Sequence, residues 1–410
     1  MKPMLIISYD ALGDKDFDIL LKYPAFSKLA QQSTVFRNVP SIFVSNTYPI
    51  HTSVATGVLP CVHGIISNTE PYPVKSPVWN SSERDIKVKT LWQTAAGQGI
   101  KVAAVFWPVT GFSKSIRYNV PEVPARPGKN QVITSLKAGN AWLQFKLLLR
   151  YGKLLNGINQ PNLDNFAAAS MAYILRKHNP GLALVHLTAY DSLCHKHGKG
   201  SPGLDAAFEA MDNNLAALLD AAGDERDIIL FSDHSQINVH TYSDPNELIA
   251  EMGLLHESYA KGSADGHADG RYASVHSDWH RCFFECCGGC AFFHGGSLSD
   301  EAVGSVRNRI ELSDGFFRFL SPDEMQDSGY SHASFGFCAK AGYCYGMADS
   351  TSKANHGYTL DMPDYTVFYM IKGSGITQEP DKPGSLLDIA PLAARLLGLS
   401  RGKQGDGSCA

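Results

Sequence analysis

The sequence predicts an α/β protein with a doubly wound, mostly parallel sheet, and two observations support this fold class. Five short runs are rich in apolar and β-branched residues, which is typical of parallel strands buried on both faces. These runs are Met4–Ser8, Val102–Phe106, Leu182–Leu187, Ile228–Phe231 and Tyr365–Ile371. Segments with helical spacing lie between the runs, and strands that alternate with helices favour a parallel sheet.

Two of the helical segments are well defined. Leu204–Ala221 carries apolar residues three or four positions apart, which places them on one face of a helix. Ser385–Leu397 has the same spacing and is followed by Gly398, a residue type that commonly ends helices. Both segments are therefore expected to pack an apolar face against the sheet.

The chain has 410 residues, which is enough for one large α/β core with a smaller insert. We expect residues 1–238 and 356–410 to form the core. Residues 239–355 are rich in Gly, Ser, His and Cys and show poor periodicity. They are interpreted as an insert or cap-like region within the same domain.

Composition and charge limit the classes of partner. The net charge of −4 gives no reason to expect a nucleic acid polymer, and the basic cluster from Lys146 to Lys153 is interpreted as a solvated helix face. No stretch of 18 apolar residues occurs, so no membrane span is expected. The first apolar run is too short for a signal peptide, and a cytoplasmic location is therefore expected.

Four of the nine cysteines lie close together, at Cys282, Cys286, Cys287 and Cys290. Their spacing, C-x3-C-C-x2-C, loosely resembles a zinc site. Free thiols in a reducing compartment are the favoured interpretation, because disulfides are rare there.

Carboxylates follow three of the predicted strands. Asp10, Asp191 and Asp233 come shortly after the runs that begin at residues 4, 182 and 228. The carboxyl ends of parallel strands meet at one edge of the sheet, where ligands bind. A single Asp at this position is more often a helix cap, but three together predict a shared site.

Histidines accompany these carboxylates. His195 lies one helical turn after Asp191, His234 follows Asp233 directly, and His356 precedes the last predicted strand. Carboxylate oxygen and imidazole nitrogen are ligands that zinc accepts when no thiolate is used. The chain has 15 histidines, so some matches arise by chance, and His186, His197 and His240 are not assigned to the site.

Thr47 stands near the predicted start of a helix, in the segment S-N-T-Y-P-I-H-T-S-V-A-T-G at residues 45–57. The free N–H groups and positive dipole of a helix start favour an anion there. A metal-bound hydroxyl at this position can act as a nucleophile. The alternative is that Ser45 or Thr47 simply caps the helix.

Taken together, these motifs resemble the nucleotide pyrophosphatase/phosphodiesterase family of the alkaline phosphatase superfamily. The resemblance covers V-S-N-T-Y-P-I-H at residues 44–51 and T-G-V-L-P-C-V-H-G-I-I-S-N at residues 56–68. It continues in D-S-L-C-H-K-H-G at 191–198, S-D-H at 232–234 and N-H-G-Y at 355–358. The motifs are in family order and span almost the whole chain, which implies an alkaline phosphatase-like core.

The resemblance also implies roles for individual residues. Two Zn²⁺ ions are expected, with Mn²⁺ as a possible substitute. One ion would be held by Asp10, Thr47, Asp233 and His234, and the other by Asp191, His195 and His356. Thr47 would be the nucleophile of a phosphodiesterase or nucleotide pyrophosphatase that forms a covalent phosphothreonine. Asn68 would bind a non-bridging phosphate oxygen, and Tyr48 would stack on the organic group of a small phosphate diester or nucleotide.

The sequence departs from the family pattern at Ile50, Cys194, Ser235-Gln236 and Thr359-Leu360. None of these changes removes a metal ligand or the nucleophile, so they concern the substrate pocket. A phosphomonoesterase or a phosphonate hydrolase of the same superfamily stays an alternative. The absence of Arg or Lys near Thr47 in the sequence favours diesters. A catalytically inactive binding protein or a metal-independent mutase fits less well, because nucleophile and ligands are all present.

Overall fold

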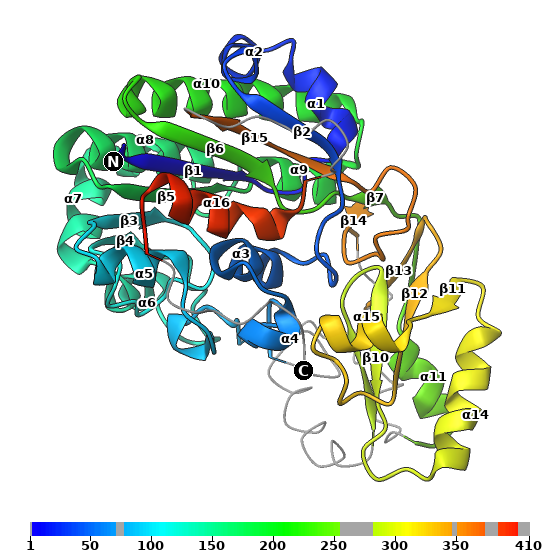
Figure 1. Cartoon of the computed structure of the whole chain (residues 1–410). Coiled ribbons are helices and arrows are strands. Elements are labelled where there is room, and N and C mark those ends of the chain that lie inside the picture. Colours follow the sequence, from blue (N-terminus) through cyan, green and yellow to red (C-terminus); the bar gives the residue numbers. More distant parts are fainter. Residues whose placement is uncertain (1, 71–77, 255–281, 347–350, 374–383, 401–410) are drawn as a thin grey trace.

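The computed structural model describes residues 2–70, 78–254, 282–346, 351–373 and 384–400. Within these segments, seven strands form the central sheet in the order β2-β15-β6-β1-β5-β3-β4 (Figure 1). Their bounds are β1 Met4–Tyr9, β2 Thr34–Val39, β3 Val102–Val105, β4 Tyr118–Val120, β5 Leu182–Leu187, β6 Asp227–Ser232 and β15 Val367–Lys372. β1 pairs in parallel with both β5 and β6, so the predicted α/β class with a mostly parallel sheet is confirmed.

One strand runs in the opposite direction to the prediction. The run Tyr365–Ile371 corresponds to β15, which is antiparallel to both β6 and β2. The prediction of a parallel strand there is wrong. β15 is buried on both faces, and a doubly buried strand has the same apolar composition whichever way it runs.

Helices cover both faces of the sheet (Figure 1). Side chains alternate along β1, so Leu5 and Ile7 pack against one layer while Met4 and Ile6 pack against the other. The first layer contains α2 Pro24–Gln31, α8 Asn162–His178 and α10 Asp205–Ala222. The second contains α3 Thr47–Thr56, α5 Leu91–Gly97 and α16 Ile389–Leu396. α10 and α16 match the two predicted helices.

A second sheet lies within residues 239–355. It is antiparallel, in the order β11-β12-β10-β9, and has its own aromatic core around Phe284, Phe293 and Phe337. Its strands are β9 Phe283–Cys286, β10 Cys290–His294, β11 Phe316–Phe319 and β12 Phe335–Ala339. Helices α11 Pro245–Glu251, α14 Asp300–Glu311 and α15 Pro322–Asp327 belong to the same region. The division of the chain into a core and an insert stays a prediction.

The described segments contain further helices and strands. They are α1 Asp14–Leu20, α4 Pro60–His63, α6 Gln131–Ala138, α7 Ala141–Tyr151, α9 Ala189–His197, β7 Ile237–Asn238, β8 Thr241–Ser243, β13 Tyr343–Tyr345 and β14 Ala354–Asn355. Four 3-10 turns complete the described part, at Glu83–Asp85, Gly152–Leu154, Pro202–Leu204 and Leu386–Asp388. No helix in the described segments has the length and apolar character needed to cross a membrane.

The turn between β9 and β10 contacts the segment after β14, which leads on to β15 of the central sheet. The N–H of Gly289 donates to the carbonyl oxygen of His356 at 2.9 Å. Gly357 adopts a φ of +83°, and a Cβ there would overlap the carbonyl oxygen of Cys287. Glycine is therefore required, because any side chain would push the two segments apart.

A buried carboxylate on α8 fixes the start of α9. Asp164 Oδ1 accepts the N–H of Thr188 at 3.0 Å, and Asp164 Oδ2 accepts the N–H of Ala189 at 2.8 Å. These are N–H groups that a helix start leaves without intrahelical partners. Asp164 thereby sets the position of the first turn of α9, which carries Asp191.

We predict that Asp164→Ala lowers the free energy of unfolding by about 1–3 kcal/mol, because it leaves two buried N–H groups without an acceptor. Urea denaturation followed by circular dichroism measures the change. Lys177→Ala is the matched control, since this residue is exposed on the same helix. Equal stability of the two variants would contradict the role assigned to Asp164.

Candidate functional site

The three predicted carboxylates lie at one edge of the central sheet. Asp10 follows β1 directly and Asp233 follows β6 directly, while Asp191 lies in the first turn of α9 after β5. β1 is hydrogen-bonded to both β5 and β6, so the three chain segments leave the sheet side by side. Parallel pairing thus brings the three side chains to the same edge, where open α/β sheets bind ligands.

One cluster centres on the imidazole of His234. Its Nε2 lies 3.4 Å from Asp10 Oδ1, 3.4 Å from Asp233 Oδ2 and 3.4 Å from the hydroxyl oxygen of Thr47. Asp10 Oδ1 and Asp233 Oδ2 are buried, and neither accepts a hydrogen bond from any residue in the described segments. Buried acceptors are normally satisfied, so two unsatisfied carboxylate oxygens beside an imidazole indicate a cation site.

The other oxygen of each carboxylate is held in place. Asp10 Oδ2 lies 3.1 Å from Nε2 of His186. Asp233 Oδ1 accepts the backbone N–H groups of Ala11 at 3.0 Å and His234 at 2.8 Å. Such outer partners orient metal ligands, which leaves the inner oxygen of each carboxylate aimed at the cluster.

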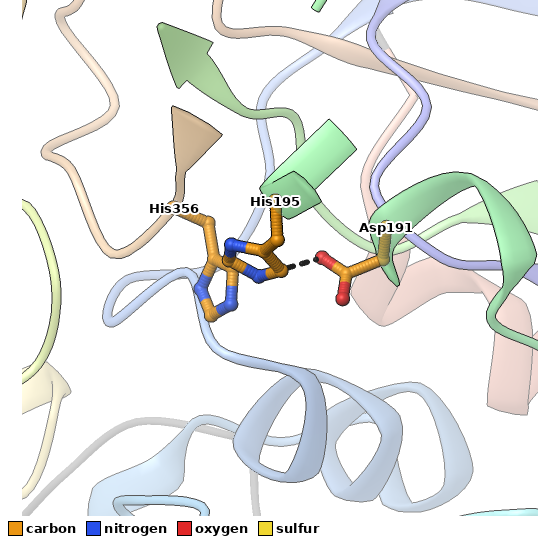
Figure 2. Close-up of side chains that lie close together, drawn as sticks. All are labelled: Asp191, His195 and His356. Atoms are coloured by element: carbon orange, nitrogen blue, oxygen red, sulfur yellow. Dashed lines mark ion pairs between the residues drawn. The ribbon is translucent and has the colours of Figure 1, made fainter. Parts of the chain in front are cut away.

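Asp191, His195 and His356 form a second cluster, in which the potential ligand atoms lie within 4.8 Å of one another. Figure 2 shows the two imidazoles side by side and the ion pair between His195 and Asp191, whose Nε2 and Oδ1 are 3.3 Å apart. Asp191 also lies within 4.8 Å of the ligand atoms of Asp10 and His234. The two clusters therefore adjoin through Asp191.

All three imidazoles present the same ring nitrogen to the clusters. Nδ1 of His195 lies 2.7 Å from the carbonyl oxygen of Ala354, and Nδ1 of His234 lies 3.3 Å from that of Ser235. Nδ1 of His356 lies 2.9 Å from the amide oxygen of Asn46. Carbonyl and amide oxygens only accept hydrogen bonds, so Nδ1 carries the proton and the lone pair of Nε2 is left available to a cation.

Burial governs the ionisation of these groups. It raises the pKa of Asp10 well above its ordinary value, and the neighbouring charges of Asp233 and Asp191 add to the effect. It also raises the pKa of Asp233 to about 6 and lowers the pKa of His234 to about 4. The cluster at His234 thus combines a neutral imidazole with two buried carboxylates, and this donor set fits divalent cations.

Thr47 is the first residue of α3. The residue before it, Asn46, occupies the N-cap position, so the alternative in which Ser45 or Thr47 is the cap is wrong. Asn68 faces the same helix start, because its Oδ1 accepts the N–H of Tyr48 at 2.8 Å. This contact leaves the Nδ2 amide of Asn68 as the group that can donate to a ligand.

A cavity of about 1350 Å³ joins these residues. Thr47, Asn68, Asp191, His195 and His356 all line it. None of the residues that line it within the described segments is a Lys or an Arg. An anion bound in this cavity would therefore depend on cations, helix N–H groups and amides rather than on basic side chains.

Aromatic side chains form part of the cavity wall. Tyr48 is only 1% exposed, and its ring packs 5.2 Å from that of Trp79, which also lines the cavity. Trp79 is the more accessible of the two rings. The stacking role expected for Tyr48 stays a prediction.

Several residues at the site were not identified from the sequence. His186, which was set aside, is buried beside Asp10, and its Nδ1 lies 2.9 Å from Nε2 of His51. His51 in turn places Nδ1 2.8 Å from the carbonyl oxygen of Thr47. Gln236 donates an amide N–H to Asp191. A signal for His186 was its position inside an otherwise apolar strand, where a polar side chain needs a partner.

The four clustered cysteines do not form a metal site with one another in the described segments. Cys286, Cys287 and Cys290 are free thiols, as expected, and Cys290 donates its S–H to the carbonyl oxygen of Gly357 at 2.8 Å. Cys290 thus supports the segment that carries His356. Cys61, in contrast, is disulfide-bonded, which does not fit a reducing compartment, and the cytoplasmic location stays a prediction.

Comparison with known proteins agrees with this geometry. The type I phosphodiesterase/nucleotide pyrophosphatase family matches residues 4–290. Human ectonucleotide pyrophosphatase/phosphodiesterase family member 1 is 23% identical over 227 residues, which is 52% of this chain and 21% of that protein. The chain therefore spans about a fifth of the length of this relative.

Solved structures share the fold over almost the whole chain. Human ectonucleotide pyrophosphatase/phosphodiesterase 5 superposes with a TM-score of 0.68 at 16% identity, covering 99% of this chain and 97% of that one. Phosphonoacetate hydrolase from Sinorhizobium meliloti, in complex with phosphonoacetate, gives 0.65 at 16% identity, with coverage of 97% and 96%. From the extent of the family match, the chain belongs to the type I phosphodiesterase/nucleotide pyrophosphatase family.

Proposed function

We propose that this protein is a two-zinc hydrolase that cleaves phosphodiester or pyrophosphate bonds through a covalent phosphothreonine at Thr47. The observation that carries this proposal is the convergence at His234. One oxygen of Asp10, one oxygen of Asp233 and the Thr47 hydroxyl oxygen each lie 3.4 Å from its Nε2. The two carboxylate oxygens are buried and have no hydrogen-bond partner in the described segments. A nucleophile next to an incomplete cation site is the arrangement that phosphoryl transfer needs.

The chain's own residues suggest how two ions would be held. Asp10, Thr47, Asp233 and His234 would hold one zinc, and Asp191, His195 and His356 the other. Bound zinc would lower the pKa of a coordinated hydroxyl or water and stabilise charge on the attacking and leaving oxygens. Neither cluster contains a thiolate. Oxygen and nitrogen ligands select zinc less strictly than thiolates do, so Mn²⁺ is a possible substitute.

The covalent step would take place at the start of α3. Thr47 Oγ1 forms a bond to phosphorus while the bond to the leaving oxygen breaks, and water later cleaves the phosphothreonine. The N–H groups at the start of α3 and the Nδ2 amide of Asn68 would donate to the non-bridging oxygens. These donors are fixed before the substrate binds, which favours the charge that develops in the transition state.

The charge of the cavity supports a diester over a monoester. A phosphate monoester carries one more negative charge than a diester and needs additional cationic groups. No Lys or Arg lines the described part of the cavity, which counts against a monoester as substrate. The lack of basic side chains also counts against a small molecule that carries both a phosphonate and a carboxylate. The retained nucleophile and ligand set count against an inactive binding protein.

We predict that Thr47→Ala lowers kcat/KM for a phosphodiester at least about 1000-fold, because the covalent step loses its nucleophile. Hydrolysis of bis-p-nitrophenyl phosphate measures this, and circular dichroism checks that the fold is kept. Thr47→Ser retains a hydroxyl and serves as the control that should keep part of the activity. A Thr47→Ala variant with near-wild-type rates would rule out the assignment.

We predict that His356→Ala lowers the zinc content from two equivalents to about one, because one cluster loses a ligand. Elemental analysis of dialysed protein measures the content. His197→Ala is the matched control, since His197 is exposed on α9 and outside both clusters. Two tightly held equivalents in His356→Ala would contradict the ligand assignment.

We predict that kcat/KM for bis-p-nitrophenyl phosphate exceeds that for p-nitrophenyl phosphate by at least about tenfold on zinc-loaded protein, because the cavity lacks cations for the second charge. Both rates are followed by the release of p-nitrophenolate. A ratio below one would instead assign the protein to the monoesterases.

A further inference from the structure

Residues 233–238, which we call the β6–β7 segment, contact each part of the chain that carries a proposed metal ligand of the central sheet. The segment runs from the end of β6 through β7, and Asp233 and His234 at its start belong to one of the two clusters. Asp233 also accepts the N–H of Ala11, the residue that follows Asp10, at 3.0 Å. The proposed hydrolysis assigns no role to the other four residues of the segment.

The end of the β6–β7 segment holds the chain around the second cluster. β7 pairs with β14, which ends directly before His356. The side-chain amide of Asn238 accepts the N–H of Lys199 at 2.6 Å and donates to the carbonyl oxygen of Lys199 at 3.0 Å. Lys199 follows α9, and its Nζ donates to the hydroxyl of Ser235 at 2.8 Å. The segment therefore joins the end of α9 to the chain that leads into His356.

Gln236, in the middle of this segment, contacts Asp191 at two points. Its Nε2 amide donates to the carboxylate Oδ1 of Asp191 and, at 3.2 Å, to the backbone carbonyl oxygen of the same residue. Both oxygens act as acceptors, so the NH₂ group of Gln236 rather than its Oε1 faces Asp191. The contact fixes the backbone and the carboxylate of the residue through which the two clusters adjoin.

The same carboxylate oxygen faces an imidazole (Figure 2). Asp191 Oδ1 lies 3.3 Å from Nε2 of His195. This Nε2 presents a lone pair, because the Nδ1 proton of His195 is donated to the carbonyl oxygen of Ala354. Two groups that both offer lone pairs do not hold each other in place until a cation lies between them. Gln236 supplies the donor that keeps Asp191 in this position.

Gln236 is an unfavourable residue for the stability of the fold. It is only 2% exposed, and its Oε1 has no hydrogen-bond partner in the described segments. A buried acceptor without a partner lowers stability, whereas an apolar side chain of similar size avoids this penalty. Residues that break such local rules are typically found at functional sites.

We propose that Gln236 is a positioning residue, which holds Asp191 between the two clusters and thereby sets the spacing of the two proposed metal ions. This inference rests on the proposed function. Gln236 acts through Asp191, since it is not among the described residues that line the cavity. Two ions stabilise the attacking and leaving oxygens only at a suitable separation, so a displaced Asp191 lowers kcat more than it weakens substrate binding.

Zinc binding to the metal-free, full-length protein gives the first test, measured by competition with a chromophoric chelator. In Gln236→Met we expect one zinc site to weaken at least about tenfold, while the other stays within about threefold of wild type. The melting temperature of the metal-free variant should stay within about 4 °C of wild type, because the lost contact and the lost unsatisfied acceptor offset each other. Gln236→Asn keeps an amide that is one methylene shorter, and it should show the same selective loss of zinc affinity.

Gln93→Met on α5 is the matched control. Gln93 also uses its side-chain amide to hold the backbone, because its Oε1 accepts the N–H of Thr90 at 3.0 Å. It lies outside both clusters and is not among the described residues that line the cavity. This control should lower the melting temperature without changing either zinc affinity, which is the opposite of the pattern expected for Gln236→Met.

Kinetics at saturating zinc give the second test. Gln236→Met should lower kcat for bis-p-nitrophenyl phosphate at least about tenfold and leave KM within about threefold of wild type. Adding Gln236→Met to Asp191→Ala should reduce kcat/KM by less than about a further twofold, because Gln236 acts through Asp191.

The outcomes separate this inference from the proposed function. Unchanged zinc affinities in Gln236→Met would overturn the role of Gln236 alone, provided that the wild type binds two zinc ions and hydrolyses the diester. Weakening of both zinc sites together with a lower melting temperature would indicate a structural role and would also overturn it, as would additive losses in the double variant. A wild-type protein that neither binds zinc nor hydrolyses the diester would refute the proposed function itself.

Discussion

The site depends on the electrostatic cost of burying Asp10 and Asp233 together. Each side chain places one oxygen against the imidazole of His234, and neither of these oxygens has a hydrogen-bond partner in the described part of the chain. In water such groups would be solvated, whereas inside a protein they repel each other and favour protonation. Divalent cations reverse this preference. Burying the two carboxylates together therefore lowers the stability of the fold, and a bound divalent cation would offset this cost.

The surrounding structure restrains this unfavourable arrangement. The outer oxygens of both carboxylates are fixed by an imidazole and by backbone N–H groups, and each imidazole of the two clusters is fixed through Nδ1. The side chains therefore have little freedom to turn away from each other. Preorganised ligands of this kind bind cations tightly, because little conformational entropy is lost when the cation enters.

Much of the fold and of the site followed from local patterns. Strand ends and carboxylates could be located because a parallel sheet brings the carboxyl ends of its strands to one edge, so Asp10, Asp191 and Asp233 were placed together before their distances were known. The direction of β15 could not be inferred, because burial on both faces gives the same apolar run in either direction. The second sheet was missed for a related reason. Its strands are four or five residues long and lie among Gly and Cys residues, so their pairing depends on distant partners rather than on local periodicity.

The close approach between Gly357 and the turn at Cys287 has a consequence for assembly. His356 is the proposed ligand that comes last in the chain, and the turn between β9 and β10 contacts the segment that carries it. Asp10, Asp191 and Asp233 all follow strands of the central sheet, whereas the cluster of Asp191, His195 and His356 also depends on the segment that Gly289 and Cys290 contact. Zinc binding at this cluster would then depend on the folding of the second sheet, so the zinc content would be lower in molecules whose second sheet is unfolded.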